Sequence, residues 1–199
     1  MVDLDAESIT AVALGIGLAA SAGFRVFVPM LVASVAAHLG ILPVQDGFSW
    51  LASWPAIVCF GTATAAEIAA YYVPFIDNLL DTVTTPMAVG AGTLLMTSVL
   101  PIDSNMLRWT TGFIIGGGIA ATMQGGSVLL RLLSSSLTGG IGNSGVTTGE
   151  NAAAIGTSLL SLVIPLIVVP VLLVLVVILL VFFRKRILRR NGAVLHRAA

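Results

Sequence analysis

Long apolar runs separated by short polar stretches extend from near the start of the chain to residue 183. A helix needs about 20 mostly apolar residues to cross the hydrocarbon core of a bilayer. Five segments meet or nearly meet this requirement, namely 9–38, 51–73, 84–102, 109–137 and 152–183. The pattern therefore predicts an all-α, polytopic transmembrane bundle with about five spans.

The last of these segments, 152–183, is longer than one crossing requires. As a helix it would reach about 48 Å, against a hydrocarbon core of about 30 Å. It is too short for two full crossings, so we expect one tilted or kinked helix. Pro165 and Pro170 are the expected kink points, and the helix should end at the basic run 184–186.

Composition and charge agree with a membrane protein. Hydrophobic residues make up 57 % of the 199 residues, charged residues 9 %, and mean hydropathy is +1.06, whereas soluble domains carry about 25 % charged residues. Disordered, nucleic-acid-binding and disulfide-based secreted proteins are thereby excluded. Three of the nine basic residues and all nine acids precede residue 184, and the other six basic residues lie within 184–199. Because basic flanks stay in the cytoplasm, we expect a single membrane domain, 1–185, with its N-terminus outside and a basic cytoplasmic tail, 186–199.

A short internal similarity points to a repeat. Gly17-Leu-Ala-Ala-Ser21 matches Gly118-Ile-Ala-Ala-Thr122 at an offset of 101 residues. Three predicted crossings separate the two starts, so a true repeat would be inverted, which is a transporter architecture with interrupted helices. We expect such interruptions in both first helices, within 21–29 and 124–127. The alternative is that Gly- and Ala-rich helices resemble one another by composition alone.

Polar side chains within the predicted spans are the candidate substrate-binding residues. A charge at the centre of a membrane helix costs about 2.5–3.5 kcal/mol on insertion scales. Arg25 and Glu67 lie inside predicted spans, and Gln124, Ser127 and Arg131 share one helix face by their spacing. In the functional interpretation an arginine attracts an anion and Glu67 is the protonatable partner. The structural alternatives are an ion pair between Arg25 and Glu67, and an Arg131 that snorkels to the interface.

A second set of polar residues provides candidate ion ligands. Asp77 and Asp81 are four residues apart and would present two carboxylates on one helix face, which suits a hard cation. Capping of the helix that follows is the favoured alternative. The glycine-rich stretch 134–151 predicts an outside loop in which Asn143 is a further candidate. We recognise no metal-binding or cofactor motif and no nucleophile–base pair, so we expect no cofactor and no enzymatic activity.

Gly112 and Gly116 form a GxxxG pair in the fourth predicted span. Small residues at this spacing let two helix backbones approach closely. The shared face predicts close helix packing, within the bundle, with a second copy of the chain, or with a partner in a larger membrane complex. The lipid bilayer is the other expected partner, and nucleic acid is not expected.

Four motifs resemble signatures of one known family. They are Ala22-Gly-Phe-Arg-Val-Phe-Val-Pro29, Leu51-Ala-Ser-Trp-Pro55, Asp77-Asn-Leu-Leu-Asp-Thr-Val-Thr-Thr-Pro86 and Thr138-Gly-Gly-Ile-Gly-Asn143. Over residues 8–185 the chain resembles the bacterial membrane family catalogued as domain of unknown function 4126. The resemblance implies a small helical protein of the bacterial inner membrane, without a defined activity or substrate. It places Arg25, Asp77, Asp81 and Asn143 in shared motifs, and Ser144 stands where the family pattern has proline.

Two functions from different classes follow from these observations. The first is a transporter or channel-like protein for a small, anionic solute, with a polar interior between interrupted helices. The second is an accessory or scaffolding subunit of a larger membrane complex. In that case small-residue faces would bind partner helices, and the buried charges would only fix packing.

Overall fold

The computed structural model describes residues 6–73, 76–138 and 142–165, together with 167, 170–174, 177–178 and 181, but not the side chains of residues 7 and 76–79. The elements within these ranges are helical, and no strand occurs among the described residues. In chain order they are α1 (Ala6–Ala22), α2 (Phe27–His38), η1 (Ser49–Ala52), α3 (Trp54–Ala70), α4 (Ile76–Val99), α5 (Asn105–Thr111), η2 (Gly112–Gly117), α6 (Gly118–Thr138) and α7 (Asn143–Val163). The all-α prediction is confirmed.

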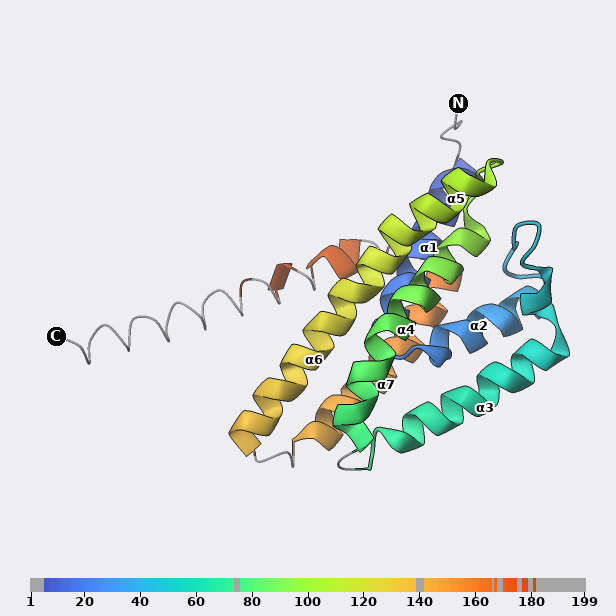
Figure 1. The fold of residues 1–199 in the computed structure, drawn as a ribbon. Helices are drawn as coiled ribbons and strands as arrows, with labels where there is room; N and C mark the ends of the chain where they lie inside the picture. Colours follow the sequence, from blue (N-terminus) through green and yellow to red (C-terminus); the bar gives the residue numbers. More distant parts are fainter. Residues whose placement is uncertain are drawn as a thin grey trace.

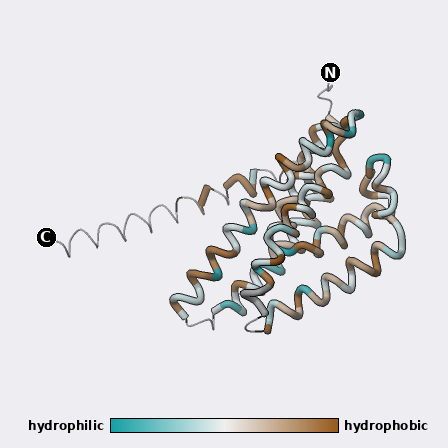
Figure 2. The backbone as a smooth tube through the Cα atoms, in the orientation of Figure 1, coloured by the Kyte–Doolittle hydropathy of each residue, from teal (hydrophilic) through white to brown (hydrophobic). Residues whose placement is uncertain are grey.

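The helices form a bundle from which one hairpin branches (Figure 1). α1 runs from the N-terminal end toward the middle of the bundle, where α2 leaves it at an angle, and α3 packs on α2 as the chain returns to the start of α4. α1 also packs against α4 and α7, while α4 packs against η2 and α6. Hydrophobic residues occur along all of these helices (Figure 2).

The first predicted span, 9–38, is two helices instead of one. Its expected interruption is confirmed, because α1 ends at Ala22 and α2 begins at Phe27. The 12 residues of α2 reach only about 18 Å, too short to cross a bilayer alone. Gly23 allows the break to pack closely against α6. Any larger residue would clash there, because its Cβ would lie 2.5 Å from the Met123 Cβ.

The second expected interruption, at 124–127, is wrong. Helices α5, η2 and α6 are continuous from Asn105 to Thr138, and this 34-residue segment is, among the described residues, the one helix long and apolar enough to span a membrane. Gly125 and Gly126 are tolerated because a glycine lowers helix stability by only about 1 kcal/mol, which packing readily outweighs. The irregular part is the π-helical η2, which begins at Gly112, upstream of the expected break.

The boundaries of α4 and α7 also differ from the predicted ones. The expected loop at 134–151 is mostly helical, since α6 continues to Thr138 and α7 starts at Asn143. α4 starts at Ile76 instead of residue 84 and contains Pro86. Instead of the kink within one helix expected at Pro165, α7 ends at Val163, and Ile164 has a non-helical φ of −140°. A residue before proline disfavours the helical conformation. The basic tail lies outside the described residues.

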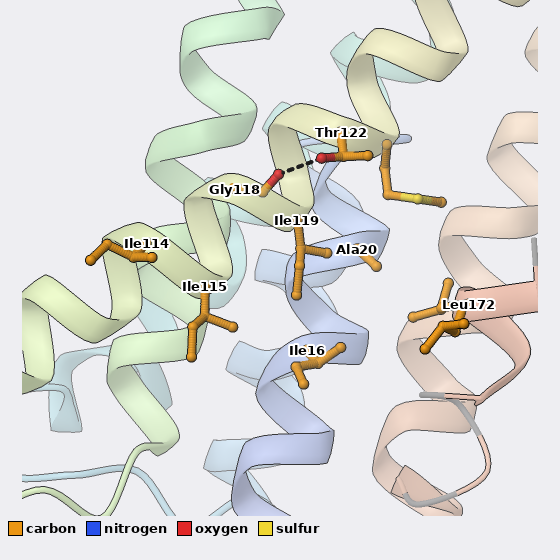
Figure 3. A pocket seen from close by; sticks show the side chains of 10 residues that line it. Ile16, Ala20, Ile114, Ile115, Gly118, Ile119, Thr122 and Leu172 are labelled. Atoms are coloured by element: carbon orange, nitrogen blue, oxygen red, sulfur yellow. Dashed lines mark hydrogen bonds between the residues drawn. The ribbon is translucent and has the colours of Figure 1, made fainter. Parts of the chain in front are cut away.

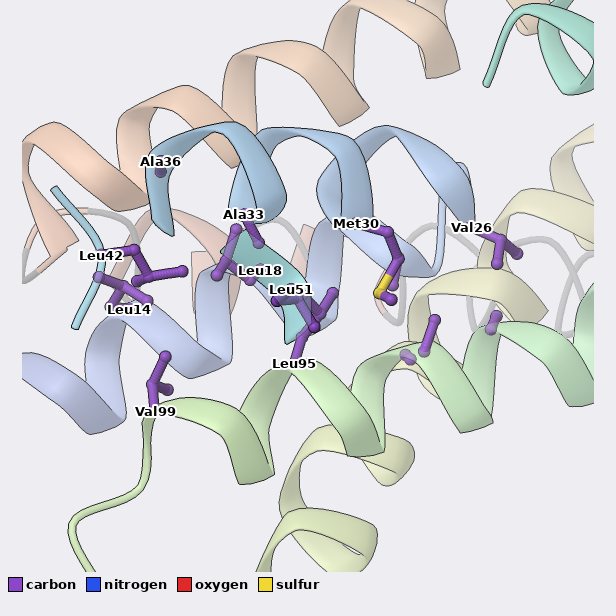
Figure 4. Close-up of a cluster of buried hydrophobic side chains, with 14 residues drawn as sticks. Leu14, Leu18, Val26, Met30, Ala33, Ala36, Leu42, Leu51, Leu95 and Val99 are labelled. Carbon is purple, nitrogen blue, oxygen red and sulfur yellow. The ribbon is translucent and has the colours of Figure 1, made fainter. Parts of the chain in front are cut away.

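Two kinds of packing hold the bundle together. Leu14, Leu18, Met30 and Leu95 belong to a buried aliphatic cluster between α1, α2 and α4 (Figure 4). The backbones of α4 and η2 approach each other closely at glycines.

The GxxxG face predicted for a partner is part of this contact. A Cβ on Gly116 would lie 2.5 Å from the Met96 Cβ, and one on Gly112 would lie 3.1 Å from the Thr93 carbonyl oxygen. The Gly112/Gly116 face is thus covered by α4 of the same chain, which corrects its assignment to a second copy or partner.

Candidate functional site

The break between α1 and α2 places Arg25 in the interior of the bundle. Its guanidinium donates hydrogen bonds to the Asn151 side-chain oxygen at 2.6 Å, to Glu150 Oε2 at 3.0 Å and to the Thr147 carbonyl at 3.4 Å. These three partners lie on one face of α7. Arg25 is 1 % exposed, so its charge is compensated by α7 and not by water.

Glu150 is shared between two arginines. Arg131 Nε donates to Glu150 Oε1 at 3.1 Å, and the Arg131 guanidinium also bonds to Oε2, the oxygen that Arg25 contacts. The Ser127 hydroxyl, one turn before Arg131 on α6, donates to Oε1. Arg25, Arg131 and Glu150 are each at most 5 % exposed. Buried charges need such pairing, since an unpaired ion in a low-dielectric interior is very costly.

Tyr71, directly after α3, joins the two arginines to α4. The guanidinium carbons of Arg25 and Arg131 lie 3.9 Å and 4.2 Å from the centre of its ring, within the range of cation–π attraction. The Tyr71 hydroxyl hydrogen-bonds to Asp81 at 3.3 Å and to the Thr84 hydroxyl at 2.9 Å. Asp81 also forms an ion pair with Arg131 at 3.5 Å.

Gln124 completes this arrangement by donating to the Thr84 hydroxyl at 3.2 Å. We call the set of connected side chains the ion cluster; it consists of Arg25, Tyr71, Asp81, Thr84, Gln124, Ser127, Arg131, Glu150 and Asn151. Four of the five predicted substrate-binding residues belong to it.

Glu67 binds elsewhere, so the expected Arg25–Glu67 ion pair is wrong. The Glu67 carboxylate accepts the backbone N–H groups of Val26 at 2.8 Å and Phe27 at 3.0 Å, at the start of α2. The first N–H groups of a helix lack partners within the helix, and this end attracts negative charge. Glu67 still lies near enough to Arg25 and Arg131 for their charges to interact. Because Arg131 is buried in the ion cluster, its expected snorkelling to the interface is wrong as well.

Two of the three candidate ion ligands, Asp81 and Asn143, have described side chains, and each has partners within the protein. Asp81 serves as a counter-ion of Arg131. Asn143 exchanges hydrogen bonds with Ser135, which join the end of α6 to the start of α7. The side chain of Asp77 lies outside the described residues; its backbone belongs to α4, so the expected cap before a helix starting at residue 84 is wrong. Within the described part of the chain, no group of three or more His, Cys, Asp or Glu side chains could hold a metal ion.

The comparison with known families agrees with the resemblance of the motifs. The sequence model of the family described as "Domain of unknown function (DUF4126)" matches residues 12–185. The chain belongs to this family. No curated protein and no solved structure matches the chain. The description of DUF4126 names no activity.

Sequence reasoning missed Glu150 and Asn151 of this DUF4126 chain, because both lie in the stretch 134–151, which the sequence analysis interprets as a loop. It also missed Tyr71, an aromatic residue within the predicted span 51–73. The sequence of α7 did contain a pattern that indicates a buried helix. Its polar residues recur at helical spacing and form a buried stripe: Thr147, Glu150, Ser158 and Ser161. Ser158 hydrogen-bonds to the Ser21 hydroxyl at 2.6 Å. A polar stripe of this period in an apolar region indicates a helix that faces other helices and not lipid.

A separate cavity of about 540 Å³ lies between α1, η2 and α6. Its lining is almost entirely aliphatic, with Ile16, Ile119 and Leu172 around it (Figure 3). The one hydroxyl in the lining, that of Thr122, donates to the Gly118 carbonyl of its own helix at 2.8 Å. None of the lining residues belongs to the ion cluster, so this cavity has no charged group with which to select a polar solute.

Proposed function

We propose that this protein is a small integral membrane transporter for a small anion, and that Arg25 and Arg131 bind the anion. The observation that supports this most directly is the sharing of one buried carboxylate by two buried arginines. Glu150 occupies the position that a bound anion would take. Two converging guanidinium groups suit a planar oxyanion because each can donate parallel N–H bonds.

The location of the ion cluster favours transport over a purely structural role. Charged residues within membrane helices are expensive and commonly mark solute pathways. Here the cluster adjoins the break between α1 and α2, and broken helices that direct an N-terminus toward an anionic group are a feature of transporters. The start of α2 already binds a carboxylate, that of Glu67.

The proposal includes a chain that crosses the bilayer several times. The 24 residues of α4 and the 21 of α7 reach about 36 Å and 32 Å, enough for a core of about 30 Å. α1 and α3, with 17 residues each, reach about 26 Å. Exposed apolar side chains such as Phe113 and Leu160 would face lipid, while α2 would not cross the bilayer by itself.

Anion flux into liposomes containing the purified full chain tests this function. Chloride and nitrate are the primary probes, because the position held by Glu150 accommodates a carboxylate-sized group, and sulfate tests a larger anion. We expect at least one labelled anion to enter faster than into protein-free liposomes. Arg131→Gln should lower this flux by about tenfold or more, since it removes one of two charge-assisted contacts.

Arg108→Gln is the matched control. Arg108 is also a buried arginine, but it lies in α5 and bonds to Asn105 of the same helix, outside the ion cluster. Its replacement should leave the flux unchanged. Wild-type flux equal to that of protein-free liposomes for all three anions would overturn the proposal. So would an Arg131→Gln variant that folds, by circular dichroism and gel filtration, and transports like the wild type.

A structural role for the ion cluster is the competing explanation. It corresponds to the accessory-subunit hypothesis, in which buried charges only lock helices together. That role predicts a less stable Arg131→Gln variant and no wild-type flux in the same liposomes. Stoichiometric copurification of other polypeptides in mild detergent would then favour the subunit.

A further inference from the structure

Glu150 is the charged group that an incoming anion would have to replace. Both oxygens of its carboxylate are in use: Arg25 and Arg131 contact Oε2, and Arg131 and Ser127 contact Oε1. An anion can reach the two arginines only if Glu150 gives up some of these contacts. The release of Glu150 is therefore a required step of the proposed transport.

The charged groups around Glu150 come from every helix packed there. Arg25 comes from the α1–α2 break and Arg131 from α6. Asp81 of α4 pairs with Arg131. Glu67 belongs to α3, and its carboxylate binds the start of α2. From there it interacts electrostatically with both arginines. Among the described residues of this region, two positive charges thus face three carboxylates. Tyr71 adds a titratable hydroxyl, which bonds to Asp81.

An anion that entered alone would add one more negative charge to a region in which the described carboxylates already outnumber the arginines. A further uncompensated charge is costly in a buried, low-dielectric site, because little water is available to solvate it. A proton taken up at the same time keeps the total charge constant. Bound to a carboxylate oxygen of Glu150, that proton would also turn an acceptor of guanidinium N–H groups into a neutral carboxyl, which binds arginine much more weakly.

Glu150 is better placed for this proton than the other two acids. It is the carboxylate that binds both arginines directly, so its neutralisation weakens a contact of each arginine at once. Glu67 has its two oxygens on backbone N–H groups of α2, and its neutralisation would leave the arginines occupied. Asp81 contacts Arg131 and is more exposed than Glu150.

We infer that this protein carries its anion together with a proton, and that Glu150 is the residue that takes up the proton and releases the arginines to the anion. The inference rests on the proposed function. In each cycle an O–H bond forms at Glu150 as the anion arrives on Arg25 and Arg131. That bond breaks on the other side of the membrane, where the carboxylate displaces the anion from the arginines.

The test follows proton movement and anion movement in the same liposomes. Full-length protein is reconstituted with a pH-sensitive dye inside, and chloride, nitrate or sulfate is added outside without a pH gradient. None of the three carries a titratable proton at neutral pH. With potassium on both sides and valinomycin present to hold the membrane potential at zero, acidification of the lumen reports coupled protons. We expect the lumen to acidify as the anion enters, at one proton per chloride or nitrate.

Glu150→Gln is the decisive variant, because glutamine is a neutral side chain of the same shape as the protonated carboxyl. We expect any anion flux that remains in this variant to be independent of external pH and to lose the accompanying proton movement. Asp103→Asn removes an exposed acid outside the ion cluster and should leave coupling intact.

The possible outcomes separate the two proposals. Wild-type anion flux without proton movement overturns the inference and leaves the proposed function standing. A Glu150→Gln variant that still moves protons with the anion overturns it too. Absence of wild-type flux for all three anions defeats the proposed function itself. If Glu150→Gln does not fold, the wild-type ratio of protons to anions still decides whether coupling exists, and Glu150→Asp, which keeps a titratable group, should retain coupling.

Discussion

The close contact between α4 and η2 allows a quantitative prediction for Gly116→Ala. A Cβ at residue 116 would lie 2.5 Å from the Met96 Cβ and would overlap the Gly92 carbonyl oxygen as well. Carbon atoms in favourable contact are about 3.5–4.0 Å apart. The two helices would therefore have to separate by about 1 Å at this point, because Gly92 contributes backbone and cannot rotate away.

Overpacking of this kind costs about 1–3 kcal/mol. Alanine has a higher helix propensity than glycine by about 1 kcal/mol, which offsets part of the loss. Gly90→Ala on α4 provides a matched control, because a Cβ there meets nothing within 4 Å. We expect Gly116→Ala to lower the free energy of unfolding by up to about 2 kcal/mol and Gly90→Ala to leave it equal or raise it by up to about 1 kcal/mol. The two variants should therefore differ by about 1–3 kcal/mol.

Unfolding of the purified protein in detergent micelles by increasing sodium dodecyl sulfate, followed by circular dichroism, measures this difference. Gel filtration of both variants tests the alternative role of the glycines. If Gly116 instead faced a second copy of the chain, its alanine variant would change the oligomeric state without this loss of monomer stability. Equal stability of the two variants would refute the packing argument.

Two further substitutions test the polar contacts of the interior. Glu67→Ala should leave the N–H groups of Val26 and Phe27 without their acceptor, at about 1–3 kcal/mol for each group left unsatisfied. Hydrogen exchange should then become faster in α2, and unchanged exchange there would contradict the capping role. Tyr71→Phe keeps the ring beside the arginines but removes the hydroxyl bound to Asp81 and Thr84. It should cost about 0.5–1.5 kcal/mol in the same detergent unfolding assay, and a variant as stable as the wild type would show that these hydrogen bonds contribute nothing.

Helical content and the first helix break were predictable because they depend on local features. Long apolar runs without strand-like alternation specify helices, and the glycine and proline around Arg25 specify an interruption. The same reasoning failed at Gln124–Ser127 and at 134–151, where glycine-rich sequence is helical. Glycine permits other conformations without requiring them, and the contacts of α6 and α7 with the rest of the bundle decide between them.

The sequence alone also singled out Arg25, Gln124, Ser127 and Arg131, because polar residues in an apolar chain must be shielded from lipid. It could not assign their partners. Glu150 lies 125 residues from Arg25, and only the packing of α7 against α1 and α6 brings it between the two arginines. Glu67, expected to pair with Arg25, binds the start of α2 instead. Hydrophobicity determines which residues are buried, but electrostatic pairing depends on distances of a few ångströms, which only the tertiary structure sets.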